Sequence, residues 1–175
     1  MEIVIALYRP QIPPNTGNIA RLCVALDSEL VIVGKPSFSW DDKQLRRAGL
    51  DHWDKVRFTH MPRFKDFYLS YKERRILPVT KVGNQHLFEF SFSPQDVVLF
   101  GNETAGLPPK VLKFFPISLR LPMWGPVRSL NLANAVAVVA YEYYRQMYTR
   151  GLVRPEVHPP RTYYREKNFS ERQRT

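Results

Sequence analysis

Residues 13–21 bring together polar side chains that can bind an anion or hold a reacting group. The segment reads PPNTGNIAR, and its Asn15, Asn18 and Arg21 stand three residues apart. Asn18 and Arg21 therefore share one face of a helix, and the start of that helix offers backbone N–H donors to a ligand. Because Arg21 is surrounded by apolar residues, its charge needs a partner. The alternative to a ligand is a structural salt bridge.

Two further segments place a carboxylate, a hydroxyl or an amide beside glycine. Residues 97–108 (VVLFGNETAGLP) run from an apolar strand into Gly101, which permits close approach of a ligand to the backbone. Glu103 follows and can accept a hydrogen bond from an arginine or a hydroxyl group. Residues 119–135 (LRLPMWGPVRSLNLANA) lead from a strand into a helix that Ser129 or Asn131 can cap. Plain strand-to-helix turns and helix caps are the structural alternatives.

Several common enzyme classes are excluded by missing motifs. The chain has no GxxxxGK[ST], GxGxxG or HExxH motif, which argues against an NTPase, a nicotinamide-dependent dehydrogenase and a zinc hydrolase. No histidine adjoins the polar segments, so a nucleophilic triad is poorly supported. The four histidines also lack the spacing of metal ligands: His52, His60, His86 and His158. A single cysteine, Cys23, excludes an internal disulfide.

Short apolar strands alternate with helices, and this alternation must position the three segments. We expect strands at residues 2–7, 30–33, 55–59, 75–80, 97–100 and 117–121, and helices at 15–26, 41–48, 62–71, 109–114 and 132–147. Asn15 or Thr16 is the expected N-cap of the first helix. The pattern favours an α/β fold with a mainly parallel sheet flanked by helices. Ligands of such folds bind at the carboxyl ends of strands, where all three polar segments lie.

Size and charge narrow the class of partner. A chain of 175 residues predicts one domain. Its 26 Lys and Arg against 16 Asp and Glu give a net charge of +10, which favours a nucleic-acid partner, although many basic proteins bind nothing anionic. The absence of a long apolar run and of a secretory signal predicts a cytoplasmic protein without a membrane span. Residues 154–175 form a basic tail with interleaved tyrosines, either a nucleic-acid contact or a solvated terminus.

Taken together and in this order, the polar segments resemble the signature motifs of the SPOUT superfamily of RNA methyltransferases. The closest likeness is to the small single-domain tRNA ribose 2′-O-methyltransferases that act on the wobble cytidine or uridine. The matching stretches are residues 12–21, 40–51, 99–108 and 121–137, and the resemblance spans residues 1–150. Each motif alone is weak, whereas all of them in order are highly specific. The sequence departs from relatives at Asn102, where Pro or Ser is common, and at the variable Trp124-Gly125 loop.

The resemblance implies a fold, a cofactor and partners. The fold would be an α/β SPOUT methyltransferase domain over residues 1–150 with a C-terminal deep trefoil knot, followed by a basic tail over residues 151–175. The cofactor would be S-adenosylmethionine, without a metal. The protein would be a homodimer, built partly from the helix that starts after Asn131, and both subunits would form the active site. The partner would be the anticodon stem-loop of tRNA, with neither DNA nor a membrane involved.

The resemblance also assigns roles to residues. Its catalytic positions fall on Asn15, Arg21, Glu103, Ser129 and Asn131, and its cofactor contacts fall on Val79, Gly101, Leu121 and Ser129. Because a guanidinium keeps its proton, Arg21 is expected to act electrostatically and to hold phosphate, with Glu103 orienting it. Asn15, Ser129 and Asn131 would fix loops and the ribose 2′-hydroxyl. Methylation of another tRNA or rRNA site, and a non-catalytic tRNA-binding protein, are the alternative functions.

Overall fold

One parallel sheet organises the part of the chain that the computed structural model describes, residues 2–40 and 55–154. Across the sheet the strand order is β3-β2-β1-β6-β4-β7-β5, and every pairing is parallel. The prediction of a mainly parallel sheet is therefore confirmed. In chain order the strands are β1 (Val4–Tyr8), β2 (Glu29–Val33), β3 (Phe58–Met61), β4 (Ile76–Val79), β5 (Gln85–His86), β6 (Val97–Phe100) and β7 (Leu119–Arg120).

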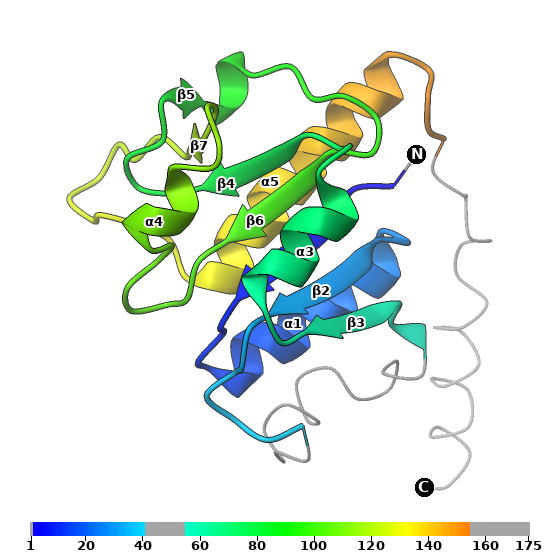
Figure 1. Cartoon of the computed structure of the whole chain (residues 1–175). Helices are drawn as coiled ribbons and strands as arrows, with labels where there is room; N and C mark the ends of the chain where they lie inside the picture. The colour runs from blue at the N-terminus through cyan, green and yellow to red at the C-terminus, as the bar shows by residue number, and fades with distance from the viewer. Residues whose placement is uncertain (1, 41–54, 155–175) are drawn as a thin grey trace, which may run out of the picture.

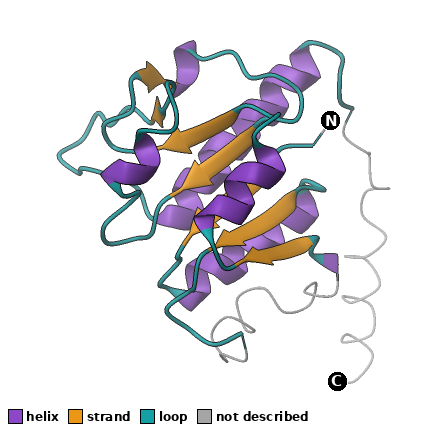
Figure 2. Ribbon diagram, in the orientation of Figure 1, coloured by secondary structure: helices purple, strands orange, loops and turns teal. Residues whose placement is uncertain are grey.

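Helices cover both faces of this sheet (Figures 1 and 2). Side chains of α1 and α5 join the core on one face, and side chains of α3 and α4 join the core on the other. This arrangement confirms the expected flanking helices, which parallel sheets need because their connections cross over the faces. The helices are α1 (Pro13–Ala25), α3 (Phe64–Tyr71), α4 (Pro109–Leu112), α5 (Leu132–Thr149) and the short 3-10 helix η2 (Leu87–Glu89).

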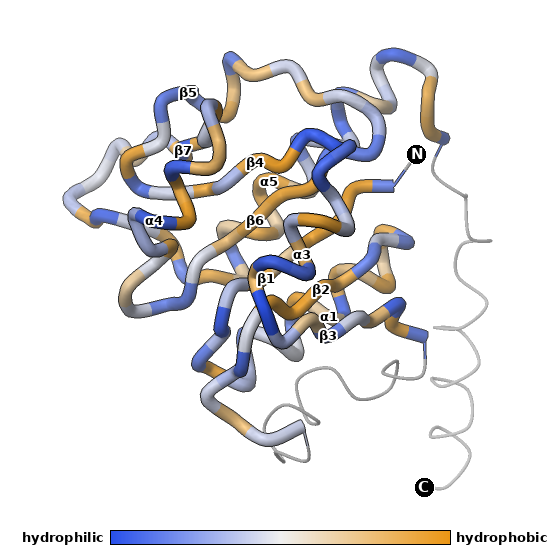
Figure 3. Tube along the Cα trace, viewed as in Figure 1, coloured by the Kyte–Doolittle hydropathy of each residue, from blue (hydrophilic) through white to orange (hydrophobic). Residues whose placement is uncertain are grey.

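The first strand shows how the sequence builds two cores at once. Ile5 and Leu7 enter the core under α1 and α5, whereas Val4 and Ala6 enter the core under α3 and α4. Successive side chains of a strand point to opposite faces, so a strand covered on both sides must be apolar throughout. Figure 3 shows the central strands mostly in the orange of hydrophobic residues.

Several element boundaries differ from the expected ones. The strand expected at residues 55–59 lies later, at Phe58–Met61, and the helix expected at 109–114 already ends at Leu112. The long C-terminal helix continues to Thr149. Nothing in the sequence pattern predicts β5 or η2, which are two and three residues long. The expected helix at 41–48 and the tail beyond Arg154 lie outside the described residues.

The expected N-cap of α1 is wrong. The helix begins at Pro13, its N-cap is Ile12, and no side chain caps it. Pro13 and Pro14 occupy the first turn, where a missing N–H costs nothing because those donors have no partner inside the helix. Asn15 and Thr16 therefore lie inside the helix, and both are buried. This shift leaves the Asn15 side chain available for contacts with other segments.

The strand β7 lies between two strands that precede it in the chain. The Leu119 carbonyl accepts a hydrogen bond from Thr80 N at 2.8 Å, and Gln85 N donates to the Ser118 carbonyl at 3.0 Å. Packing there is tight, since a Cβ atom at Gly83 would lie 2.4 Å from the Leu119 backbone. The last strand thus fits between β4 and β5 with backbone in contact on both sides. Among the helices of residues 2–40 and 55–154, none has the length and apolar character to cross a membrane.

Candidate cofactor and catalytic site

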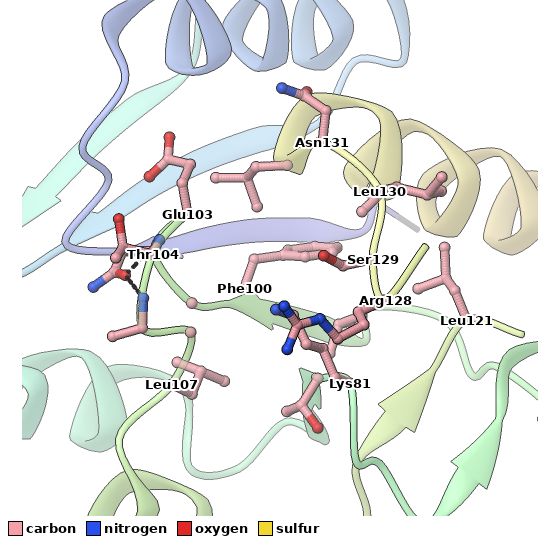
Figure 4. A pocket seen from close by; sticks show the side chains of 18 of the residues that line it. Lys81, Phe100, Glu103, Thr104, Leu107, Leu121, Arg128, Ser129, Leu130 and Asn131 are labelled. Atoms are coloured by element: carbon pink, nitrogen blue, oxygen red, sulfur yellow. Dashed lines mark hydrogen bonds between the residues drawn. The ribbon is translucent and has the colours of Figure 1, made fainter. Parts of the chain in front are cut away.

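A pocket of about 410 Å³ lies where β4, β6 and β7 end. These three strands are neighbours in the sheet, so the loops that follow them converge at one edge, the usual ligand position of a parallel sheet. The start of α5, together with Ile12 and Asn15 at the start of α1, completes the wall. The volume is in the range of small-molecule sites. Figure 4 shows the lining side chains, which come from segments far apart in the sequence.

All four expected cofactor contacts line this pocket: Val79, Gly101, Leu121 and Ser129. Four of the five expected catalytic residues line it too: Asn15, Glu103, Ser129 and Asn131. The three polar segments of the sequence are therefore brought to one place. The pocket wall also includes apolar side chains such as Phe100 and Leu107, which give it a surface suited to a ring or an aliphatic chain.

The loop after β6 turns back on itself, and this explains its glycines. A Cβ atom at Gly101 would lie only 2.1 Å from the backbone carbon of Gly106, which has a φ of +68°. The Asn102 side chain accepts hydrogen bonds from Thr104 N at 3.2 Å and Ala105 N at 2.7 Å, which fixes the turn. Gly101 is thus required by the loop itself, and close approach of a ligand is not needed to explain it.

Asn15 links the other two polar segments. Its Nδ2 donates to Glu103 Oε1 at 3.1 Å, and its Oδ1 accepts from Asn131 Nδ2 at 2.9 Å. Asn131 is the N-cap of α5, as its Oδ1 accepts from Ala133 N at 2.9 Å. A continuous chain of hydrogen bonds thus runs from the loop after β6 through α1 to the start of α5. Figure 4 shows Glu103 and Asn131 at the same upper side of the pocket.

Glu103 also holds the segment before α1. Its carboxylate accepts hydrogen bonds from Gln11 N at 2.9 Å and Ile12 N at 3.1 Å, in addition to the one from Asn15. Each of these donors lies about ninety residues away in the sequence. The carboxylate therefore fastens the entry into α1 to the pocket wall.

Arg21 does not lie with the other candidate residues. Its side chain is exposed and does not line the pocket, and within the described ranges it makes no hydrogen bond or ion pair. Within residues 2–40 and 55–154, Arg21 makes neither the expected pairing with Glu103 nor the alternative structural salt bridge. The reason is geometric: Arg21 is six positions after Asn15, so it projects from another side of α1.

Two cationic residues of the pocket were not expected from the sequence. Lys81 follows β4 and Arg128 precedes Ser129, and both line the pocket. Figure 4 shows them away from Glu103 and Asn131, in the lower half of the view. Neither makes an ion pair with any residue that the structure describes. Their only sequence signal is their position directly after a strand and within a polar motif.

The chain is similar to proteins with a known activity and to solved structures. A "tRNA (cytidine(34)-2'-O)-methyltransferase" from Escherichia coli (strain K12) is 42% identical over 151 residues, which is 85% of this chain and 96% of that protein. A solved structure that concerns "the 2-OH methylation of C/U34 on tRNA" has a TM-score of 0.82 and 42% identity, and the match covers 85% of this chain and 98% of that one.

A more distant structure contains a ligand. It is "the SpoU Methyltransferase AviRb from Streptomyces viridochromogenes in complex with the cofactor AdoMet", with a TM-score of 0.74 and 26% identity. The match covers 85% of this chain and 58% of that one. The model of the SpoU rRNA Methylase family matches residues 2–141, most of the 175 residues. The chain therefore belongs to the SpoU rRNA Methylase family.

Proposed function

We propose that the chain is a methyltransferase that uses S-adenosylmethionine to methylate the ribose 2′-oxygen of nucleotide 34, a cytidine or uridine, in tRNA. The observation that carries the proposal is the hydrogen-bonded chain Glu103–Asn15–Asn131 at the edge of the pocket. It joins the three polar segments into one site. The E. coli relative and the structure concerned with C/U34 support this choice of reaction and nucleotide.

The pocket suits S-adenosylmethionine in size and character. Val79, Gly101, Leu121 and Ser129 would hold the cofactor, with apolar walls for its adenosyl part and loop backbone for its polar atoms. Lys81 and Arg128 can attract its carboxylate, because both are cations on the pocket wall. When bound, the cofactor supplies an electrophilic methyl group on a sulfonium. No cluster of three metal-ligating side chains occurs among the described residues, and we propose a reaction without a metal.

The residues of the chain must align the ribose and provide a path for the proton of its 2′-hydroxyl group. An alcohol is a poor nucleophile, so its proton has to leave as the new bond forms. We assign Arg21 the electrostatic role: it would hold a phosphate next to the reacting ribose, and that phosphate would relay the 2′-hydroxyl proton to water as the new O–CH3 bond forms and the S–CH3 bond breaks. Asn15 and Asn131 would keep the loops in place, and Ser129 lines the pocket from the loop before α5. Glu103 is a positioning residue, because its carboxylate is engaged by Asn15 and by two backbone donors.

A homodimer would complete the site. Arg21 lies outside the pocket of its own chain, which supports a contribution to the pocket of a second chain. On α5, five exposed residues recur at helical spacing and form a stripe with apolar members: Asn134, Val138, Tyr141, Arg145 and Tyr148. Apolar side chains gathered on one exposed helix face are typical of an interface. We propose that this stripe contacts the partner chain.

Further features of the proposal concern topology and partners. The position of β7 between β4 and β5 supports a deep trefoil knot in the C-terminal half. The methyltransferase domain would span residues 1–150, and residues 151–175 would be a basic tail. The net charge of +10 suits the anticodon stem-loop of tRNA, and a reaction at a 2′-hydroxyl excludes DNA. Such a protein would act in the cytoplasm, without a membrane.

The test is methyl transfer from labelled S-adenosylmethionine to a complete tRNA pool, followed by mapping of the methylated nucleotide. We expect 2′-O-methylcytidine or 2′-O-methyluridine at position 34. Methylation of rRNA or of another tRNA position would select the first alternative. Binding of tRNA without transfer, and without any effect of the cofactor, would identify a non-catalytic RNA-binding protein.

A further inference from the structure

Two exposed aromatic rings lie against each other beside the pocket. The rings of Phe88 and Trp124 are nearly parallel, with an interplanar angle of 16° and centroids 6.4 Å apart. Trp124 is 85% exposed and Phe88 is 56% exposed, so both rings present apolar surface to water. Neither ring lines the cofactor pocket, whereas Met123, next to Trp124, does. The pair therefore lies just outside the pocket that the cofactor would fill.

The sheet explains why these two residues meet. β5 and β7 are parallel neighbours in which His86 pairs with Arg120. Phe88 follows His86 by two residues and Trp124 follows Arg120 by four, so both leave the sheet at the same edge. The loop after β7 projects from this edge in Figure 1. The aromatic pair thus follows β5 and β7, and the loop after β7 also lines the pocket.

The chemical surroundings point to a nucleic acid as the occupant. Exposed Arg120 lies at the end of β7, where its guanidinium is hydrogen-bonded to His86 Nε2, and Lys81 and Arg128 line the pocket. Among the described residues, none of these three cations has a carboxylate partner. Aromatic rings beside such cations are the combination that binds single-stranded RNA: the ring stacks on a base and the cation holds a phosphate. A hydrophobic partner would not need these charges. Exposed aromatic surface of this kind is seldom left uncovered.

We propose that Phe88 and Trp124 form a stacking platform for an unpaired base of the RNA substrate, one that adjoins the nucleotide being methylated. This proposal rests on the proposed function and adds a determinant of substrate binding. Stacking on the platform would hold the loop of the RNA while the neighbouring ribose enters the site. Because every base has a flat face, the platform selects an unstacked nucleotide rather than a particular base.

The test compares Trp124→Ala with Trp124→Phe in the full chain. Binding of an anticodon stem-loop RNA is measured by titration in the presence of S-adenosylhomocysteine. We expect the Kd to rise about 5- to 150-fold in Trp124→Ala, the usual effect of losing one base stack. Trp124→Phe keeps a ring and should retain most of the affinity. Cofactor affinity, measured by calorimetry, should stay at the wild-type value, which separates RNA stacking from damage to the pocket.

A matched control and a modified RNA sharpen this test. Phe114 is also 56% exposed but lies in a separate aromatic cluster with Phe64 and Tyr68, so Phe114→Ala should leave RNA affinity unchanged. Wild-type protein should bind an RNA with an abasic site next to nucleotide 34 more weakly than it binds intact RNA. The Trp124→Ala protein should bind the two RNAs with equal affinity. That non-additivity would place the missing base on the ring.

The outcomes separate this proposal from the proposed function. Equal RNA affinity of wild type and Trp124→Ala would overturn the platform, even if nucleotide 34 is methylated normally. A Trp124→Ala protein that sediments as a monomer would also overturn it, by assigning the ring to contact between chains. If wild type binds RNA but methylates another nucleotide, the proposed function is wrong. RNA affinity is then measured with an abasic site next to that nucleotide, and an equal loss of affinity in wild type and Trp124→Ala would overturn the platform.

Discussion

The side-chain oxygen of Asn15 accepts a hydrogen bond of 2.9 Å from the amide of Asn131, a residue 116 positions later in the chain. The other end of the Asn15 amide donates to Glu103. Asn15 is 5% exposed, so it makes these contacts away from water. Only a side chain with one donor end and one acceptor end satisfies both neighbours. The site is therefore assembled only when Asn15 offers its donor to Glu103 and its acceptor to Asn131.

Asn15→Asp tests the polarity of the link. The substitution keeps the shape but removes the donor and sets a carboxylate beside Glu103, so we expect a loss of about 1–3 kcal/mol in the free energy of unfolding. Methyl transfer should fall at least about 100-fold, since misplaced groups at a reaction site carry this scale of cost. Chemical denaturation and single-turnover kinetics measure the two effects.

The double variant Asn15→Asp with Glu103→Gln is the matched control. In the double variant, the glutamine at position 103 supplies the donor and the aspartate at position 15 supplies the acceptor, which is the reverse of the wild-type pair. Part of the lost stability should therefore return. A double variant less stable than both single variants would show that Glu103 acts mainly through the backbone donors of Gln11 and Ile12.

Gly101→Ala should destabilise the loop after β6, whatever the pocket binds. The added Cβ would overlap the Gly106 backbone at 2.1 Å, and overpacking of this kind costs about 1–3 kcal/mol or more. Gly125→Ala is the control, since nothing lies within 4 Å of a Cβ at that position. Thermal unfolding compares the two variants. A Gly101→Ala protein as stable as Gly125→Ala would mean that the loop rearranges freely.

Acid should weaken the packing of α5 through one carboxylate. Hydrogen bonds from Arg145, and next from Gln146, hold the pKa of Glu142 below its ordinary value. The carboxylate therefore stabilises the folded state fully above its unfolded pKa of about 4.3, and this contribution is lost as the pH falls through the lower folded pKa. Wild type should lose more stability than Glu142→Gln when urea unfolding is compared between pH 7 and pH 3. An equal decrease in the free energy of unfolding of the two proteins between pH 7 and pH 3 would contradict this expectation.

The parts of the site that could be predicted are those whose residues lie close together in the sequence. The strand at Val97–Phe100 is apolar throughout, so its existence and its polar continuation are evident. β7 falls within the strand expected at residues 117–121. β5 is only two residues long and is held by backbone pairing with β7, which leaves no side-chain pattern to detect. Asn15 was expected at the start of a helix, because asparagine is common there. The two prolines before it move that start, and the partners of Asn15 lie 88 and 116 residues away.

Tyr141→Asp tests the proposed contact between chains. Tyr141 is exposed in the middle of the α5 stripe, and a charge there would have to be buried without a partner in a dimer. We expect a monomer in sedimentation experiments, together with loss of methyl transfer. Leu69→Asp is the control, because Leu69 is 50% exposed on α3, which covers the opposite face of the sheet. Dissociation by both substitutions would show a general loss of folding rather than a contact on α5.

Arg21→Ala tests the role of the exposed arginine on α1. Because Arg21 has no partner among the described residues of its own chain, its removal should change the free energy of unfolding by no more than about 0.5 kcal/mol. Cofactor affinity should also stay unchanged, since Arg21 does not line the pocket. Methyl transfer should fall at least about 100-fold, the usual cost of losing one electrostatic or acid–base group. Arg21→Lys should recover little, because a lysine cannot grip a phosphate with a planar fork. Near-wild-type turnover by a folded Arg21→Ala protein would remove Arg21 from the reaction.

Mixed dimers can show which pocket Arg21 serves. Leu121→Trp fills the pocket of its own chain but keeps Arg21 intact, whereas Arg21→Ala keeps an intact pocket. If Arg21 of one chain completes the pocket of the other, a mixed dimer has one complete site, although each parent dimer has none. Random re-association of equal amounts would then restore about a quarter of wild-type activity, because half of the twofold-symmetric dimers are mixed and each has one of two sites. If Arg21 serves its own chain, no mixed dimer has a complete site and the mixture stays as inactive as its parents.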